Sequence, residues 1–326
     1  MKLELRKILA ACAALSLALT LTASALAVEG HFERTLKVTG PVDLDVGTGA
    51  GNITVRTGDP ASVRISGIIK SSGWQEGENA ERKVRYLEAN PPIVQHGNII
   101  KIGHIEDNEL QRNISISYEI TTPVETRLRS GTGSGDQNIK GIKGPLDTSS
   151  GSGTLKISAI GDTVKASTGS GEVELEDVKG NVRASTGSGN IHATGVAGGL
   201  RASTGSGDVT LQQTAPGDVE VSAASGSVRL AGVHGSLRAQ TASGDITVDG
   251  EGSGSWKLGT ASGGVTVRLP AQQGFTLNAH SVSGSIHTNR QITVQGTISN
   301  RELHGKVGDG GFLLDVSTVS GNIRIE

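Results

Sequence analysis

The sequence has very few aromatic residues: three Phe, two Tyr and two Trp in a chain of 326 residues. A compact globular core usually contains more aromatic bulk, so a conventional single-core domain is not favoured. A stacked repeat with a narrow interior, filled by Val, Ile, Leu, Thr and Ala, does not need it. The 48 glycines also suit a repeat with many tight corners.

Cysteine is nearly absent, because Cys12 is the one cysteine in the sequence. It lies in a segment with basic residues, then an apolar run, then small residues, at positions 2–7, 8–21 and 25–27. This order is typical of a secretory signal peptide, and we predict cleavage after Ala27. The alternative is a transmembrane anchor, but the apolar run is shorter than a bilayer span. We therefore expect a secreted, periplasmic or cell-surface protein with no transmembrane segment after cleavage.

The predicted mature chain, residues 28–326, excludes several chemistries. Without cysteine it has no disulfide, thiol nucleophile or Cys-ligated zinc. Removing three basic residues and one acidic residue with the signal peptide leaves 27 basic and 31 acidic residues, a formal net charge of −4. This charge does not favour nucleic acid as a partner.

A phrase close to Ala-Ser-Thr-Gly-Ser-Gly recurs at residues 166, 184 and 202. The second glycine of this phrase belongs to a series of glycines spaced eighteen or nineteen residues apart. This spacing is too regular for a linker. The series is Gly135, Gly153, Gly171, Gly189, Gly207, Gly226, Gly244 and Gly263, and further copies lie at Gly284, Gly321 and, upstream, Gly51.

Each repeat contains two short alternating segments separated by turns, for example Val164–Thr168 and Val173–Leu175. Alternation of apolar and polar residues indicates a strand with one buried face. Two short strands cannot bury that face alone, so successive repeats must stack. The sequence therefore predicts an all-β fold, a single-chain parallel β-helix (β-solenoid) of about 18 residues per coil over residues 28–326, with regular repeats from about 129. A left-handed hexapeptide helix fits poorly, because the apolar residues do not recur every six, and we expect a right-handed or flattened two-faced solenoid.

The periodicity is lost between residues 73 and 123, where Trp74, Tyr86 and Tyr118 occur. We expect a helix within 77–92, ended by the two prolines at 91 and 92, and then strands within 97–105 and 113–123. This insertion is interpreted first as a cap over the open end of the solenoid and second as a binding insertion.

The order of these phrases resembles a known bacterial family. The segments "DLDVGTGAGNITV" and "ISISYEITTPVETRLRSGTGSGDQNI", followed by "STGSGDV" repeats, are similar to the domain-of-unknown-function family of putative adhesins. They resemble the GIN adhesin-head domains more distantly. The resemblance covers nearly the whole mature chain and implies an exported β-helical protein of the cell envelope, with no catalytic residues.

Several kinds of catalytic or ligand site are not supported. The residue after the repeated glycine varies among Asp, Thr, Glu, Asn, Ser and Gly, whereas a calcium site needs six to eight oxygen ligands in one place. No copy completes a Gly-x-Gly-x-x-Gly or phosphate loop, and Gly-x-Ser-x-Gly and His-x-x-x-His are absent. We predict no catalytic, cofactor-binding or metal-binding residue and no cofactor.

One charged row remains as a candidate surface for an anionic partner. When the repeats are aligned with one another, one outward position of the second strand forms a row of equivalent residues. This row is Asp147, Lys165, Arg183, Arg201, Glu220, Arg238 and Lys257. Lys165, Arg183 and Arg201 are the candidate binding residues. The alternative is a solvated face that protects the sheet. The companion row, Lys156, Glu174, His192, Thr210, Arg229 and Thr247, mixes both signs.

The leading functional hypothesis is a non-enzymatic, adhesin-like or cell-envelope interaction protein. Its expected partner is an anionic envelope polysaccharide or a surface protein. The alternative is a carbohydrate-active β-helix enzyme, a polysaccharide lyase or hydrolase. That alternative requires carboxylates within catalytic reach of one another, and Glu172, Glu174 and Glu176 are the candidates.

Overall fold

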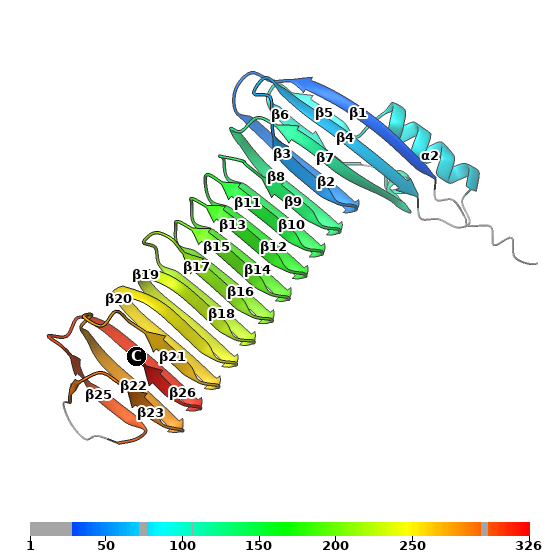
Figure 1. Cartoon of the computed structure of the whole chain (residues 1–326). Helices are drawn as coiled ribbons and strands as arrows, with labels where there is room; N and C mark the ends of the chain where they lie inside the picture. Colours follow the sequence, from blue (N-terminus) through cyan, green and yellow to red (C-terminus); the bar gives the residue numbers. More distant parts are fainter. Residues whose placement is uncertain (1–27, 72–76, 106, 295–298) are drawn as a thin grey trace, which may run out of the picture.

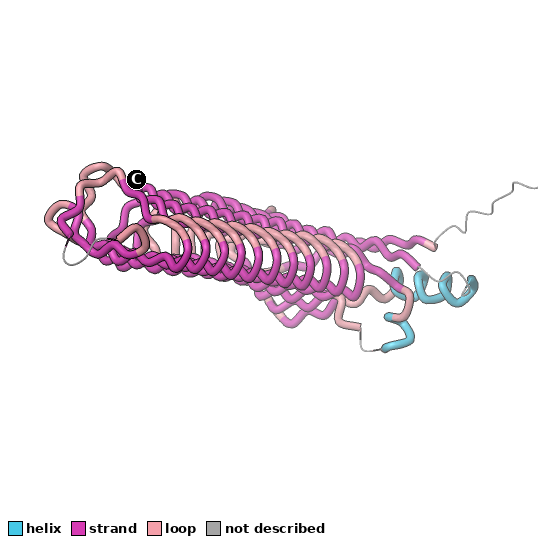
Figure 2. The backbone as a smooth tube through the Cα atoms, turned by 90° about the horizontal axis from the view of Figure 1, so that it is seen from below, coloured by secondary structure: helices cyan, strands magenta, loops and turns pink. Residues whose placement is uncertain are grey.

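The computed structural model describes residues 28–71, 77–105, 107–294 and 299–326. The chain forms a straight rod of stacked coils, with helices at one end and the C-terminus near the other (Figures 1 and 2). The predicted signal peptide, residues 1–27, lies outside the described residues. Among the described helices, none combines the length and apolarity needed to cross a membrane.

Each coil contributes one strand to each of two faces. Strands of the first face are β2 (Val42–Ala50), β8 (Thr126–Ser134), β10 (Leu146–Ser152), β12 (Val164–Ser170), β14 (Val182–Ser188), β16 (Leu200–Ser206) and β18 (Val219–Ser225). Strands of the second face are β3 (Ile53–Thr57), β9 (Gln137–Lys140), β11 (Leu155–Ile160), β13 (Val173–Val178), β15 (Ile191–Val196) and β17 (Val209–Gln213). The long strands β19 (Val228–Ser243) and β20 (Ile246–Ser262) belong to both faces.

Parallel pairing holds neighbouring coils in the register that the sequence predicts. Val164 pairs with Val182, and Val182 pairs with Leu200, each eighteen residues along the chain. Leu200 pairs with Val219, one residue farther, where the intervening turn is longer. The predicted all-β, solenoid-like fold is confirmed.

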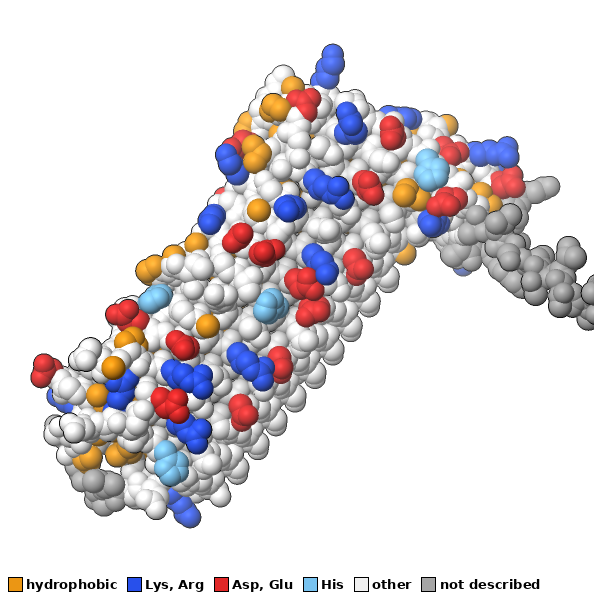
Figure 3. Space-filling view, in the orientation of Figure 1, with side chains coloured by type: hydrophobic (Ala, Val, Ile, Leu, Met, Phe, Trp, Pro, Cys, Tyr) orange, Lys and Arg blue, Asp and Glu red, His pale blue; other side chains and the backbone are white. Residues whose placement is uncertain are grey.

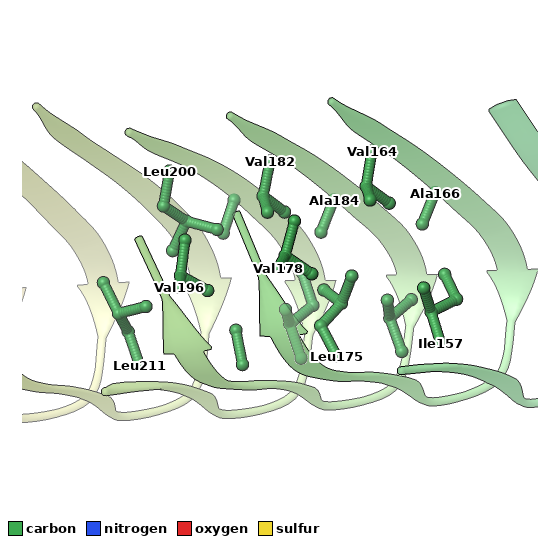
Figure 4. Close-up of a cluster of buried hydrophobic side chains, with 14 of the residues drawn as sticks. Ile157, Val164, Ala166, Leu175, Val178, Val182, Ala184, Val196, Leu200 and Leu211 are labelled. Atoms are coloured by element: carbon green, nitrogen blue, oxygen red, sulfur yellow. The ribbon is translucent and has the colours of Figure 1, made fainter. Parts of the chain in front are cut away.

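Aliphatic side chains from both faces fill the interior of the rod (Figure 4). The apolar positions of the alternating segments are buried, as the alternation predicts. Each of the following has at most 3% of its surface exposed: Val164, Val173, Leu175, Val182, Leu200, Val209 and Leu211. Burial of each such side chain contributes about 1.5–3 kcal/mol relative to exposure. The core is continuous, so each coil depends on its two neighbours.

The corner of each coil explains the repeated Thr-Gly-Ser-Gly. The hydroxyl of the buried Thr186 donates to the carbonyl oxygen of Gly171 in the preceding coil, at 3.0 Å. Thr168 and Thr204 do the same with Gly153 and Gly189. These hydroxyls therefore bond to the corner carbonyl of the preceding coil.

The glycine is required because neighbouring corners approach closely. A Cβ atom on Gly189 would lie 1.9 Å from the Gly171 carbonyl oxygen, and Gly189 has a φ of +154°. Both features exclude a larger residue.

At the N-terminal end, the segment that breaks the repeat adds a further coil, and strands from this segment and from the residues before it cover that coil. Strands β6 (Ile99–Ile102) and β7 (Ile114–Thr122) pair in parallel with β2 and β3. Antiparallel strands follow outside them: β5 (Ile93–His96), β4 (Ser62–Ser71) and β1 (Glu29–Lys37).

The helix predicted within 77–92 is confirmed as α2 (Gly77–Ala89), and a short helix α3 (Asn108–Gln111) precedes β7. Ala80, Val84 and Leu87 are each 2% exposed, and their spacing places them on one face of α2. This helix packs on β1 and β4, at the outer edge of the stack (Figure 1).

At the C-terminal end, the order of the coils in space differs from their order in sequence. The remaining strands are β21 (Val265–Arg268), β22 (Phe275–Ser283), β23 (Ile286–Thr288), β24 (Ile292–Val294), β25 (Glu302–Val307), β26 (Phe312–Ser320) and β27 (Ile323–Ile325). Strand β26 lies between β20 and β22, and β27 lies between β21 and β23. The last coil therefore inserts between two earlier ones, and antiparallel β25 and β24 close the first face.

Candidate functional site

A groove of about 1320 Å³, open to solvent, runs along the first face from β8 to β20. We call it the axial groove. The first few residues of β8, β10, β12, β14, β16 and β18 line it, in most cases together with the turn residue before them, and residues from the second halves of β19 and β20 continue it. Seven strand-to-strand steps of about 4.8 Å make it about 34 Å long, parallel to the rod.

Strand alternation places the charged residues of the groove on the outside. Val164 and Ala166 of β12 are buried, so Lys165 between them points to solvent, and the same alternation holds in β14 and β16. The lining contains seven cationic residues: Arg127, Arg129, Lys165, Arg183, Arg201, Arg238 and Lys257. It contains three carboxylates: Asp147, Asp218 and Glu220.

The three candidate residues lie side by side as the sequence predicts. Lys165 pairs in register with Arg183, and Arg183 with Arg201. The row continues to Arg129 at one end and to Arg238 and Lys257 at the other. Arg127 and Arg129 were missed in the sequence, although Arg129 lies eighteen residues before Asp147 in an alternating segment.

Two of the three candidates form ion pairs along the row. Lys165 Nζ lies 3.3 Å from an oxygen of Asp147, and Arg201 pairs with Glu220. Farther along, Lys257 Nζ lies 3.9 Å from Asp315. The cationic side chains of these pairs are 57–60% exposed, so each pair contributes little to stability.

Arg183 differs from its two neighbours. Both residues beside it in the row are cationic, and among the ion pairs between described residues none includes Arg183. Like charges on directly opposite residues are unfavourable in a sheet. Arg183 is therefore the point in the row where an added anion relieves the most repulsion.

The net charge of the groove has the opposite sign to that of the chain. Seven cationic residues and three carboxylates give the lining a formal charge of +4, whereas the whole sequence has −2. A groove whose net charge has one sign concentrates ligands of the other sign.

Outside the groove, charges of both signs are mixed. On the second face, Lys156 pairs with Glu174 at 3.2 Å, and Arg229 pairs with Asp208 at 3.3 Å. Figure 3 shows cationic and anionic side chains interspersed over the face of the rod that it presents. The second face is thus an ordinary solvated surface, as the mixed companion row predicts.

The carboxylates considered for catalysis do not gather in the groove. Glu174 is engaged by Lys156, and the three glutamates at 172, 174 and 176 lie outside the groove lining. Inside the groove, Asp147 and Glu220 are ion-paired, and Asp218 accepts the backbone N–H of Ser236 at 3.0 Å. The described part of the chain thus shows no pair of free carboxylates in the groove.

The aspartates after the repeated glycines have a structural role. Asp136, Asp208 and Asp245 each accept the backbone N–H of the equivalent residue in the next coil, at 2.8 Å. Within the described ranges, no group of His, Cys, Asp and Glu side chains is arranged to hold a metal ion.

Tyr86 and Tyr118, the described aromatic residues of the 73–123 segment, do not form a shared surface. Tyr118 is 1% exposed and packs edge-on to Phe32, with ring centroids 6.4 Å apart, and burial raises the pKa of its hydroxyl. Tyr86 is 52% exposed on α2, and Trp74 lies outside the described residues. Tyr118 is therefore a core residue of the added coil.

The fold and groove together describe a stacked β-coil rod with a cationic track along one face. The chain belongs to the Toastrack DUF4097 family, whose model matches residues 161–326. This result confirms the resemblance, made from the sequence, to a family of putative adhesins of unknown function. No curated protein matches the chain.

Solved structures of low identity match along most of the chain. A putative cell adhesion protein from Clostridium sporogenes is 13% identical, with 91% of this chain and 99% of that chain covered and a TM-score of 0.19. A putative adhesin from Bacteroides fragilis is 12% identical, with 91% and 97% covered and a TM-score of 0.31. A putative lipid binding protein from Parabacteroides distasonis is 12% identical, with the same coverage and a TM-score of 0.38. These overall shapes differ too much to bear on the function of this chain.

Proposed function

We propose that this chain is an exported, non-enzymatic, adhesin-like protein of the cell envelope that binds an extended anionic partner along the axial groove. The observation that carries the proposal is the formal charge of +4 in the groove of a chain with a net charge of −2. The partner class is an anionic polysaccharide of the envelope. The right-handed winding and the secretory cleavage after Ala27 are parts of the same proposal.

The rigidity of the rod suits such a partner. Parallel pairing and a continuous core hold the groove cations at fixed positions, so binding requires little ordering of the protein. Each exposed contact is weak and screened by salt, but several contacts made at once by one polymer raise the overall affinity.

Affinity chromatography on an immobilised anionic polysaccharide tests this proposal. We expect the wild-type protein to be retained at low salt and the triple variant Lys165→Ser, Arg183→Ser, Arg201→Ser to elute earlier with an unchanged melting temperature. A control variant removes the same charge from the second face: Lys156→Ser, Arg229→Ser, Arg324→Ser. Wild-type protein that is not retained, or equal loss in both variants, would contradict the use of this groove.

A depolymerisation assay on the polysaccharides that bind separates binding from catalysis. We expect their chain length to remain constant during incubation with the protein, because the groove carboxylates are engaged by other groups. Shortening of the polymer would show that the protein is an enzyme. A glycan array then identifies which acidic sugars are recognised.

Export is tested by N-terminal sequencing of material from the culture medium or envelope. The mature protein is expected to begin at Val28. An intact Met1, or a lipid on Cys12, would contradict cleavage after Ala27.

A further inference from the structure

Six of the seven cationic residues of the axial groove belong to the charged row, and they fall into two groups that alternate along the rod. The seventh, Arg127, is also exposed and lies outside the row, two residues before Arg129 on β8. Lys165, Arg201 and Lys257 each pair with a carboxylate of an adjacent strand. Arg129, Arg183 and Arg238 belong to none of the ion pairs found in the described part of the chain, and each is exposed. We call these three residues the free arginines.

The free arginines recur at a constant interval. Three strand-to-strand steps separate Arg129 from Arg183, through Asp147 and Lys165. Three further steps separate Arg183 from Arg238, through Arg201 and Glu220. At about 4.8 Å per step, the interval is about 14 Å and the whole set spans about 29 Å.

The chemistry of the free positions matches this arrangement. All three are Arg, whose planar guanidinium binds a carboxylate through two parallel hydrogen bonds, whereas two of the three paired cations are Lys. The carboxylates of the row are already bound by neighbouring cations, so the free arginines are the cations of the row without an anionic partner. Arg238 also donates a long hydrogen bond to the neutral Gln240 Oε1, at 3.5 Å.

The uncharged lining indicates what kind of polymer carries the anionic groups. Between the charges the groove presents Thr163, Asn181, Ser222, Ser236, Gln240 and Ser255. Hydroxyl and amide groups suit a partner rich in hydroxyl groups. No aromatic residue lines the groove, so it lacks the stacking surface that binds single-stranded nucleic acid.

We infer that the axial groove binds a linear, carboxylate-bearing polysaccharide lying parallel to the rod, with the free arginines as its three anchor points. The inference rests on the proposed function and goes further, because it assigns binding to Arg129, Arg183 and Arg238. Lys165, Arg201 and Lys257 balance the charge of the row.

Two triple variants with equal charge loss test the inference, with hyaluronan as the probe in a binding titration at low salt. The free-arginine variant is Arg129→Gln, Arg183→Gln, Arg238→Gln, and the control is Lys165→Gln, Arg201→Gln, Lys257→Gln. We expect the first to weaken binding about tenfold or more and the second to weaken it less than about threefold. Equal weakening would show that only the total charge matters, and would overturn the inference while leaving the proposed function standing.

A conservative variant separates loss of binding from loss of folding. Arg129→Lys, Arg183→Lys, Arg238→Lys keeps all charges, and we expect intermediate affinity with an unchanged circular dichroism spectrum, because lysine cannot bind a carboxylate through two parallel bonds. Wild-type affinity in this variant would overturn the role of the guanidinium groups.

Hyaluronan fragments of increasing length provide a second measurement. Affinity is expected to rise with fragment length until one fragment spans the distance from Arg129 to Arg238, about 29 Å, and then to level off. A steady rise beyond that length would contradict three fixed anchors. Oligothymidylate that binds as tightly as hyaluronan would overturn the assignment to polysaccharide. Failure of wild-type protein to bind any anionic polysaccharide would instead reject the proposed function itself.

Discussion

Substitution of the corner glycine Gly189 by alanine tests the reasoning about how the coils stack. The new Cβ atom would lie 1.9 Å from the carbonyl oxygen of Gly171 and 2.7 Å from its carbonyl carbon. Real Cβ contacts are essentially never shorter than 3.0 Å, so the two corners must separate by about 1 Å. Because the interior is close-packed, the separation cannot be absorbed by a single side chain.

The cost follows from the bonds at that corner. Separation weakens the bond from the Thr186 hydroxyl to Gly171 O, at 3.0 Å, and the bond from Gly171 N to Ser188 O, at 3.1 Å. Each such bond contributes about 1 kcal/mol to stability. A non-glycine residue near φ +154° adds about 1–3 kcal/mol of strain. We therefore expect Gly189→Ala to lower the free energy of unfolding by about 3–5 kcal/mol.

Denaturant unfolding measures the global effect, and hydrogen exchange of the amides from 171 to 189 measures local opening. The matched control is Gly131→Ala, where the nearest atom to a new Cβ is the Ser149 hydroxyl oxygen, at an ordinary 3.6 Å. We expect this control to change stability by less than about 0.5 kcal/mol. If Gly189→Ala has no larger effect than the control, close approach of the corners does not explain the repeated glycine.

Three further predictions concern the core, metal ions and one carboxylate. Val173→Asp should cost several kcal/mol in denaturant unfolding, because it buries an unpaired charge at a position with 0% exposure, and a wild-type melting curve would contradict the packing. Incubation with EDTA should leave the melting temperature unchanged, and a decrease would reveal a metal in the fold. The carboxyl of Asp59 accepts a hydrogen bond from the backbone N–H of Ala61, which has the larger effect, and another from the hydroxyl of Ser62. These bonds hold the pKa of the carboxyl below its usual 3.8. The contribution of Asp59 to folding stability should thus be complete above pH 3.8, its ordinary pKa, and should disappear as the pH falls through its lower pKa in the folded protein. An NMR titration that gives an ordinary pKa for Asp59 would contradict this.

Much of the candidate site could be predicted from the sequence, because an outward position in one coil fixes the equivalent position in the next. Lys165, Arg183 and Arg201 were placed in one row by their spacing alone, and the structure pairs them in register. The ion pairs could not be predicted in this way. Asp147 lies beside both Arg129 and Lys165, and only the side-chain positions show that it binds Lys165.

The repeat, the two strands of each coil and the residues that face the core could all be predicted from the sequence pattern, because these features follow from contacts between one coil and the next. The pattern did not determine which coils are neighbours at the ends of the rod. The coil at residues 42–57 stacks on the one that begins at Thr126, and the last coil inserts between β20 and β22. Repeats with similar glycine corners and apolar strands can stack on one another in several orders. Packing of the whole chain, including the antiparallel strands that close each end, decides among those orders.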